Sequence, residues 1–345
     1  MALEHPQSPF SAEIRQDAEL GSTVLSLSYQ DAQDASRNLN AEIAPDLGSN
    51  LFRLRAGEHD IIYRDLALLK QMGFTGDFVL WPFPNRVRDK RYSYQGKEYS
   101  LAAVKRPTPD TVLIHGLVFD RAWQYEQPVV TATSASVTTF VDVTAADDHW
   151  YEAYPFESRL SLTYTLTAEG VQITYQVRNT GTQSLPFGFA LHPYFSTLSN
   201  KQETYISLPA KAVMEADSLL LPTGRVLDVS GIMYAMFDLR QPVAVSNLKL
   251  DHVYTQLEPG APVVVDYRGR GIQLHITSTD DFTHAVIYSA TAQDPFFCIE
   301  HQTCSTDAIN LAIQGEERQQ MAHLLEVQPG SSATGSLYYK LTFQQ

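Results

Sequence analysis

The sequence has few cysteines, no long apolar run and no excess of basic residues. Its 345 residues include only two cysteines, Cys298 and Cys304, which are too few for a secreted disulfide framework or a zinc site. No stretch approaches the ~18 apolar residues that a membrane-spanning helix requires. Residues 1–20 carry acidic side chains and lack the basic start and apolar core of a signal peptide. We therefore expect a cytoplasmic protein without a membrane partner.

The charge balance and the missing motifs exclude several further classes. A formal net charge of -14 at pH 7 repels the phosphate backbone, so no nucleic-acid partner is expected. The chain contains no P-loop, no G-x-G-x-x-G after a strand and no H-E-x-x-H. The common nucleotide-binding and metalloprotease classes therefore have no support in the sequence.

What the sequence does contain is an alternation of apolar and polar residues. This period of two is typical of half-buried β-strands, and it recurs at residues 23–29, 137–143, 160–166, 171–177 and 336–343. Gly170 lies between two of these runs and can adopt the positive φ of a tight hairpin turn. Helical periodicity is limited to residues 65–72 and 316–325. The pattern predicts an all-β fold of antiparallel strands with few short helices.

No interdomain linker interrupts the chain. The Pro- and Gly-rich breaks at residues 106–109 and 258–262 are short enough to be turns or loops. We therefore expect a single β-sandwich domain over residues 21–345, preceded by an N-terminal tail or edge segment over residues 1–20.

Glu300 is the residue that the local sequence singles out. It follows the almost wholly apolar run of residues 295–299, and a glutamate is almost never fully buried without a partner. Its carboxylate is therefore expected to have a partner or a catalytic task. Cys298 beside it has nothing that would lower a thiol pKa, and it is interpreted as a small core residue.

Three other segments hold polar residues in apolar surroundings. Asn85 and Arg86 follow a Pro-stiffened apolar stretch, and the Arg86 guanidinium suits vicinal hydroxyls or a carboxylate. His115 precedes a glycine, and His192 is embedded among aromatic residues. Each segment also fits a structural interpretation, as a charged surface loop or an ordinary core strand, so these residues alone leave the choice open.

Taken in order, these segments resemble the aldose 1-epimerase (galactose mutarotase) family. The resemblance runs through most of the chain. It rests on the Asn-Arg segment and residues 92–101 after it, the His-Gly pair and the downstream Trp123, the His-Pro-Tyr-Phe segment at residues 192–195, residues 250–254 and residues 297–303. It implies a large antiparallel β-sandwich of the galactose mutarotase type, with the sugar in an open groove on one face.

The resemblance also implies the activity and the residues that perform it. Glu300 is expected to act as the general base on the anomeric hydroxyl and His192 as the general acid on the ring oxygen, without metal or cofactor. Arg86, His115 and Asp251 are expected to orient the sugar hydroxyls, with Asn85 also in the substrate site. Trp81, Phe83 or Tyr194 is expected under the apolar face of the sugar.

Two departures and two alternatives remain. Well-known galactose mutarotases have Asn before the catalytic His and Gln shortly before the Glu strand, where this chain has Leu191 and Val286. One alternative is a hexose-6-phosphate 1-epimerase, and the other is a non-catalytic carbohydrate-binding protein. A homodimer is left open beside a monomer. The basic residues available for a phosphate are Arg86, Arg88, Lys90 and Arg91.

Overall fold

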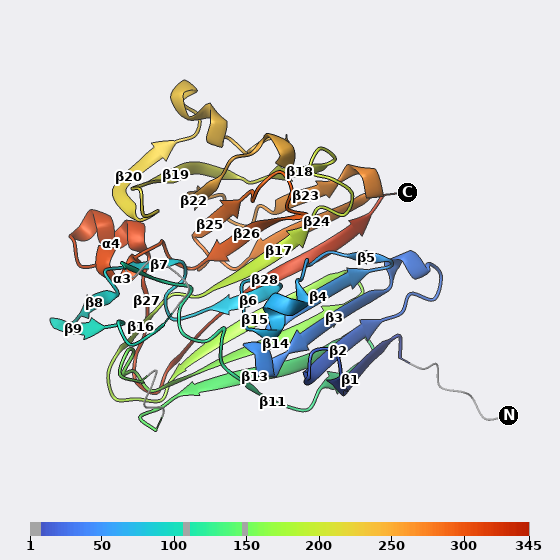
Figure 1. Ribbon diagram of the computed structural model, residues 1–345, viewed down its shortest axis with the longest axis horizontal. Coiled ribbons are helices and arrows are strands. Elements are labelled where there is room, and N and C mark those ends of the chain that lie inside the picture. The colour runs from blue at the N-terminus through green and yellow to red at the C-terminus, as the bar shows by residue number, and fades with distance from the viewer. Residues whose placement is uncertain (1–7, 106–110, 147–150, 345) are drawn as a thin grey trace.

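The computed structural model describes residues 8–105, 111–146 and 151–344. Within these residues, neighbouring strands pair antiparallel throughout the large sheets (Figure 1). The predicted break at 106–109 and residues 1–7 of the predicted N-terminal segment lie outside the described ranges. The prediction of an antiparallel β-sandwich with few short helices is confirmed.

A seven-stranded sheet carries the residues of interest. Its order is β20 (Pro222–Asp228), β19 (Ala210–Ala216), β22 (Asp251–Leu257), β25 (His284–Tyr288), β26 (Phe296–Gln302), β17 (Ala190–Ser196) and β6 (Asp77–Leu80).

A ten-stranded sheet forms the second layer. Its order is β11 (Gln124–Tyr125), β13 (Ala135–Val143), β14 (Ser158–Thr167), β15 (Gly170–Asn179), β28 (Ser332–Phe343), β24 (Ile272–Ser278), β23 (Val263–Tyr267), β18 (Thr204–Ser207) and β21 (Val243–Ala244), with β12 (Val129–Val130) paired to β13. The predicted hairpin is confirmed, because β14 and β15 pair from Ser158 to Asn179, and Thr167 and Gly170 close the turn of residues 168–169.

Smaller sheets complete the fold. The five-stranded sheet is β1 (Phe10–Asp17), β2 (Ser22–Tyr29), β3 (Leu39–Ala44), β4 (Asn50–Ala56) and β5 (His59–Asp60). Three two-stranded sheets are β7 (Arg86–Arg88) with β10 (Val112–Ile114), β8 (Arg91–Tyr94) with β9 (Lys97–Ser100), and β16 (Leu185–Phe187) with β27 (Leu325–Val327). The edge strand β1 falls within the predicted N-terminal segment. The division into that segment and one domain stays a prediction.

Short helices form at both places where helical periodicity was found. They are α1 (Leu66–Lys70) and α4 (Glu316–Ala322), with α3 (Ala308–Leu311) beside the latter. The Asp65 carboxylate caps α1 by accepting hydrogen bonds from the amides of Ala67 and Leu68. No helix within the described ranges is long and apolar enough to cross a membrane.

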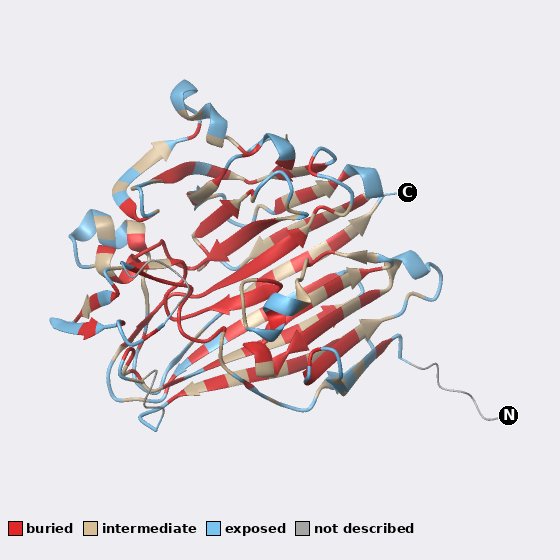
Figure 2. Cartoon of the chain, in the orientation of Figure 1, coloured by how far each residue is buried: buried red, intermediate tan, exposed pale blue. Residues whose placement is uncertain are grey.

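The main core lies between the sheets, and buried residues concentrate along their strands (Figure 2). Alternation decides which side chains of β26 enter this core. Phe297 and Ile299 belong to the core cluster, whereas Cys298 belongs to a separate cluster with Phe78 and Tyr194. Glu300 has the parity of Cys298 and therefore faces away from the main core, on the outer face of the seven-stranded sheet.

Candidate active site

His192 and Glu300 face each other across two neighbouring strands. The antiparallel register of β17 and β26 pairs Tyr194 with Cys298, and continuing it by two residues sets His192 opposite Glu300 on one face of the sheet. Nε2 of His192 lies 3.2 Å from Oε1 of Glu300. The two residues are only 6% and 2% exposed. The tertiary structure thus brings the two predicted acid–base residues into direct contact.

Burial moves the pKa values of this pair in opposite directions. It raises the pKa of Glu300 well above its ordinary value, and the charge of Asp251 adds to this effect, while Arg86 and Gln302 oppose it. Burial, together with the charge of Arg86, lowers the pKa of His192 to about 3. The pair without a ligand therefore favours its uncharged forms, with one proton held on the Glu300 carboxyl.

Aromatic rings fix the plane of the His192 imidazole. The ring of Phe78 on β6 stacks on it with centroids 4.6 Å apart, and the Tyr194 ring lies nearly parallel at 5.1 Å. The imidazole of His115 approaches edge-on at 5.0 Å. These rings exclude water from one side of the pair, which is the physical cause of the shifted pKa values.

A short two-stranded sheet brings together Asn85, Arg86 and His115. Strands β7 and β10 pair Arg86 with Ile114, and the backbone amide of His115 donates to the carbonyl oxygen of Asn85 at 2.8 Å. Nη1 of Arg86 donates to Oδ1 of Asn85 at 2.9 Å. Asn85 is 5% exposed, so it orients the guanidinium from a buried position. The Arg86 charge acts on both members of the catalytic pair.

Asp251 lies at the start of β22, two strands away from Glu300. It pairs with Tyr288 of β25 in the register and is half-buried. Its charge is near enough to raise the pKa values of Glu300 and Cys298. The structure therefore places all six predicted site residues around one face of the sheet, although their roles toward a sugar stay predictions.

Two neighbours of the pair were not found from the sequence. Nε2 of Gln302 donates to Oε2 of Glu300 at 3.4 Å, and the Gln302 residue is fully buried. Its position two residues after Glu300 in a strand was an available signal, because such residues share a face. Phe78 offered no such signal, since the pairing of β6 with β17 joins segments more than a hundred residues apart.

The two departures from the family pattern have different surroundings. Leu191 is 1% exposed and packs in the main core, opposite Val79 of β6. It therefore does not face the side of the sheet that carries Glu300. Val286 does, because it is the direct cross-strand neighbour of Glu300 in β25.

Of the three aromatic residues expected under the sugar, Trp81 and Phe83 lie elsewhere. Trp81 is fully buried and Phe83 is 4% exposed, and both pack in the main core. Both rings are covered by the core, so neither is available to lie under a sugar. Tyr194 alone lies beside His192.

Within the basic segment after Asn85, Arg88 is engaged in ion pairs. Nη2 of Arg88 lies 3.2 Å from Oδ2 of Asp217, and its Nε lies 3.7 Å from Oδ2 of Asp307. The Arg88 backbone amide also donates to Oδ1 of Asp307 at 3.1 Å. Two carboxylates thus already compensate the guanidinium that a phosphate would need.

In the part of the chain that the structure describes, no group of three or more His, Cys, Asp or Glu side chains is arranged to hold a metal ion. The polar groups around the pair are instead an acid, a base, a guanidinium and amides. This set is suited to proton transfer and to hydrogen bonding of hydroxyl groups.

Known proteins share both sequence and fold with this chain. Residues 33–340 match the family model described as Aldose 1-epimerase. Galactose mutarotase of Homo sapiens is 30% identical over 171 residues, which cover 48% of this chain and 45% of that protein. The Escherichia coli protein YihR, named as uncharacterized, is 27% identical over 237 residues, covering 68% of this chain and 72% of its own. The match to the human relative thus spans less than half of that protein.

A solved structure extends the likeness over nearly the whole chain. The galactose mutarotase-like protein of Clostridium acetobutylicum superposes with a TM-score of 0.80 and 18% identity. The superposition covers 97% of this chain and 98% of that one. At this identity, the likeness shows that the two proteins share a fold.

Proposed function

The chain belongs to the aldose 1-epimerase family of isomerases, and we propose that it interconverts the α and β anomers of a free aldohexose. One observation carries the proposal: a buried carboxyl and a buried imidazole, Glu300 and His192, lie 3.2 Å apart on one face of the sheet. Both O1 and O5 of a pyranose are bonded to C1. Two side chains in mutual contact can therefore reach both oxygens of one sugar.

The proton transfers balance within this pair. The Glu300 carboxylate removes the proton from the O1 hydroxyl, and the His192 imidazolium gives its proton to O5. As these protons move, the C1–O5 bond breaks and a C1=O1 double bond forms. Rotation about C1–C2 presents the other face of the aldehyde, and reclosure returns both protons. General acid–base catalysis of this kind contributes ~10²–10⁴-fold per transfer.

The direct contact also supplies the charged forms that this cycle uses. Burial favours a protonated Glu300 and a neutral His192 in the empty site. One proton crossing from Oε1 to Nε2 creates the carboxylate and the imidazolium without exchange with solvent. The Arg86 guanidinium stabilises the carboxylate form, and sugar hydroxyls replace the water that burial removed.

A free sugar is favoured over a hexose 6-phosphate by the state of Arg88. Its guanidinium is paired with Asp217 and Asp307, so binding a phosphate there would have to displace one carboxylate. A purely sugar-binding role is disfavoured because it does not require an acid and a base in contact. We further propose a cytoplasmic location and a small-molecule sugar as the partner, consistent with two cysteines that are both free and buried.

Polarimetry tests the proposal. Purified protein is added to freshly dissolved α-D-glucose and α-D-galactose, and the rate of optical rotation change is compared with buffer alone. We expect a faster first-order approach to the same equilibrium rotation. If the rate stays at the buffer value for every aldose tried, the free-sugar proposal fails. Inhibition by glucose 6-phosphate stronger than by glucose, and lost in Arg88→Ala or Arg91→Ala, would favour the phosphate alternative.

A further inference from the structure

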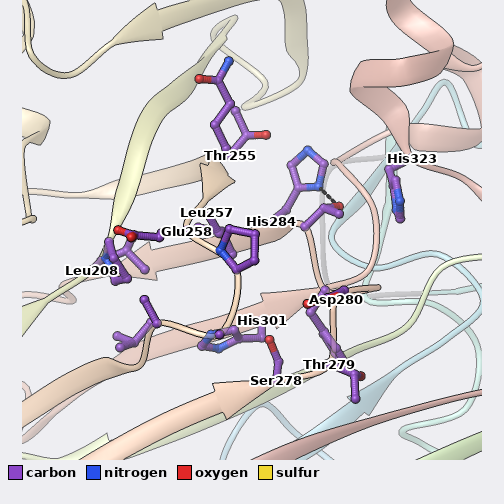
Figure 3. A pocket seen from close by; sticks show the side chains of 18 of the residues that line it. Leu208, Thr255, Leu257, Glu258, Ser278, Thr279, Asp280, His284, His301 and His323 are labelled. Atoms are coloured by element: carbon purple, nitrogen blue, oxygen red, sulfur yellow. Dashed lines mark hydrogen bonds between the residues drawn. The ribbon is translucent and has the colours of Figure 1, made fainter.

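A pocket lies at the ends of strands β22, β25 and β26, and Figure 3 shows its lining side chains. Its volume is about 300 Å³. We call it the histidine pocket, after the lining residues His284, His301 and His323. Neither His192 nor Glu300 lines it.

Strand alternation separates this pocket from the catalytic face. His301 follows Glu300 directly in β26, and successive side chains of a strand project to opposite faces. The imidazole of His301 therefore points away from the sugar-facing side and into the histidine pocket, where Figure 3 shows it among the lining side chains. Any ligand of His301 would be distinct from the sugar held by the catalytic pair.

The three histidines differ in how their rings are held. Nδ1 of His284 lies 2.8 Å from Oγ1 of Thr283, and Nδ1 of His323 lies 2.7 Å from the carbonyl oxygen of Thr303. The His301 ring, in contrast, has no hydrogen bond or ion pair with any other described residue. It is nevertheless only 4% exposed.

The ring nitrogens of His301 are not among the fully buried polar atoms that lack a partner, whereas Nε2 of His284 in the same lining is. The His301 nitrogens are therefore open to the pocket. Burial lowers the pKa of His301 to about 4, so the ring is neutral near pH 7. A neutral imidazole offers one N–H donor and one nitrogen acceptor. A hydroxyl group, which both donates and accepts, matches either nitrogen.

The other lining residues of the histidine pocket indicate the chemical class of its ligand. Leu208, Leu257 and Phe282 contribute apolar surface, and the exposed carboxylates of Glu258 and Asp280 stand in the same lining. Negative charge at the pocket and over the chain disfavours anions. Apolar walls with a few placed polar groups, at this volume, suit one small organic molecule.

We propose that the histidine pocket is a second ligand site, which binds a neutral polyhydroxylated molecule of monosaccharide size through His301. This inference goes beyond the anomerase proposal and does not depend on it. It follows from one buried imidazole without a partner in a pocket that is large enough for a ligand.

Histidine NMR tests the inference in the Glu300→Gln variant, in which turnover is suppressed. The protein is labelled with ¹³C at histidine Cε1, and the His301 signal is assigned by its loss in His301→Leu. D-glucose, D-galactose and glycerol are each titrated to about 100 mM, a range that detects a Kd on the order of 1–10 mM. We expect a saturable shift of the His301 signal with at least one of them.

Two comparisons decide the outcome. The Ala261→Trp variant fills the pocket with a bulky side chain and should abolish the His301 shift, while the signal of His275, on β24 and outside the pocket lining, should not move in either protein. His301→Leu should fold with a Tm close to that of the wild type, because the His301 ring makes no hydrogen bond with the other described residues. The inference is overturned if the His301 signal stays fixed with all three compounds, shifts without saturating, or shifts equally in Ala261→Trp. Polarimetry of the wild type judges the anomerase proposal separately.

Discussion

Val286 of β25 is the cross-strand neighbour of Glu300 of β26, on the same face of the seven-stranded sheet. An apolar isopropyl group therefore adjoins the carboxyl that is assigned as the base. It contributes to the burial that raises the pKa of Glu300. Val286 excludes water from the Glu300 carboxyl, whereas a hydrogen-bonding side chain at the same position would favour the charged carboxylate.

Val286→Gln should move the basic limb of the pH–rate profile, because the pair loses its single proton at the raised pKa of Glu300. An amide at this position can hydrogen-bond the Glu300 carboxylate, so the pKa of Glu300 should fall and this limb should shift to lower pH by about one unit or less. The measurement is kcat/KM for α-D-glucose by polarimetry from acidic to alkaline pH. An unchanged basic limb would show that Val286 does not tune the base.

Leu191→Asn provides the matched comparison on the opposite side of the sheet. Leu191 packs in the core, so the amide would be buried without partners, at a cost of about 1–3 kcal/mol in the free energy of unfolding. We expect a lower Tm with the basic limb of the pH–rate profile unchanged. Urea titration and polarimetry on the same preparation check both parts. A shifted limb with unchanged stability would place this residue at the substrate instead.

Removing either member of the catalytic pair should abolish most of the activity. Glu300→Gln and His192→Asn should each lower kcat by ~10²–10⁴-fold. The circular dichroism spectrum of each variant should match that of the wild type, because the fold is kept. Cys298→Ala is the control, because Cys298 shares their face and is buried but has a raised thiol pKa that leaves it unreactive. It should keep near-normal kcat. Near-normal kcat in either pair variant would refute the role assignment.

Gln302 should position Glu300 rather than merely fill space. Its amide donates to Oε2 of Glu300 and lowers the pKa of that carboxyl. Gln302→Leu should therefore shift the basic limb to higher pH and, by disfavouring the carboxylate, lower kcat roughly tenfold or less. Gln302→Glu, protonated at low pH, should recover part of the activity there. A change confined to Tm would mean that Gln302 is only structural.

Asp77 should make the stability of the fold depend on pH. Its Oδ2 accepts a hydrogen bond of 3.0 Å from Tyr339 of the facing sheet, and burial raises its pKa to about 8 from 3.8. Between these two values the unfolded chain releases the proton and the folded chain keeps it. Asp77 therefore contributes stability that is fully present below pH 3.8 and is lost as pH rises to about 8, at up to ~1.36 kcal/mol per pH unit.

Asp77→Asn should remove this contribution, because an amide does not titrate. Urea unfolding of both proteins between pH 5 and 8 should show the free-energy difference changing in favour of the variant as pH rises. Asp142→Asn is the control, because Asp142 pairs with Arg159 at the surface. Its free energy of unfolding should change with pH between 5 and 8 as steeply as that of the wild type. If the free energies of unfolding of the wild type and Asp77→Asn changed in parallel with pH, Asp77 would not be protonated in the folded protein.

Much of the fold could be predicted from local pattern alone. The alternating runs at 23–29 and 137–143 lie within β2 and β13, because a side-chain period of two is set by each strand itself. Glu300 could be singled out in the same way, since a carboxylate after an apolar strand conflicts with its surroundings whatever the partner is. The roles of His192, Arg86 and Asp251 depended on resemblance, because their local segments also fit a core strand or a surface loop.

The sequence by itself determined that the chain forms antiparallel strands and that Glu300 needs a partner, because both follow from neighbours along the chain. Only the tertiary structure decided that the partner is His192, since β17 and β26 come from segments about a hundred residues apart. It also decided that Leu191 faces the core and Val286 faces the base. Strand pairing and register fix these facts, and a shift of one residue would turn each side chain to the other face.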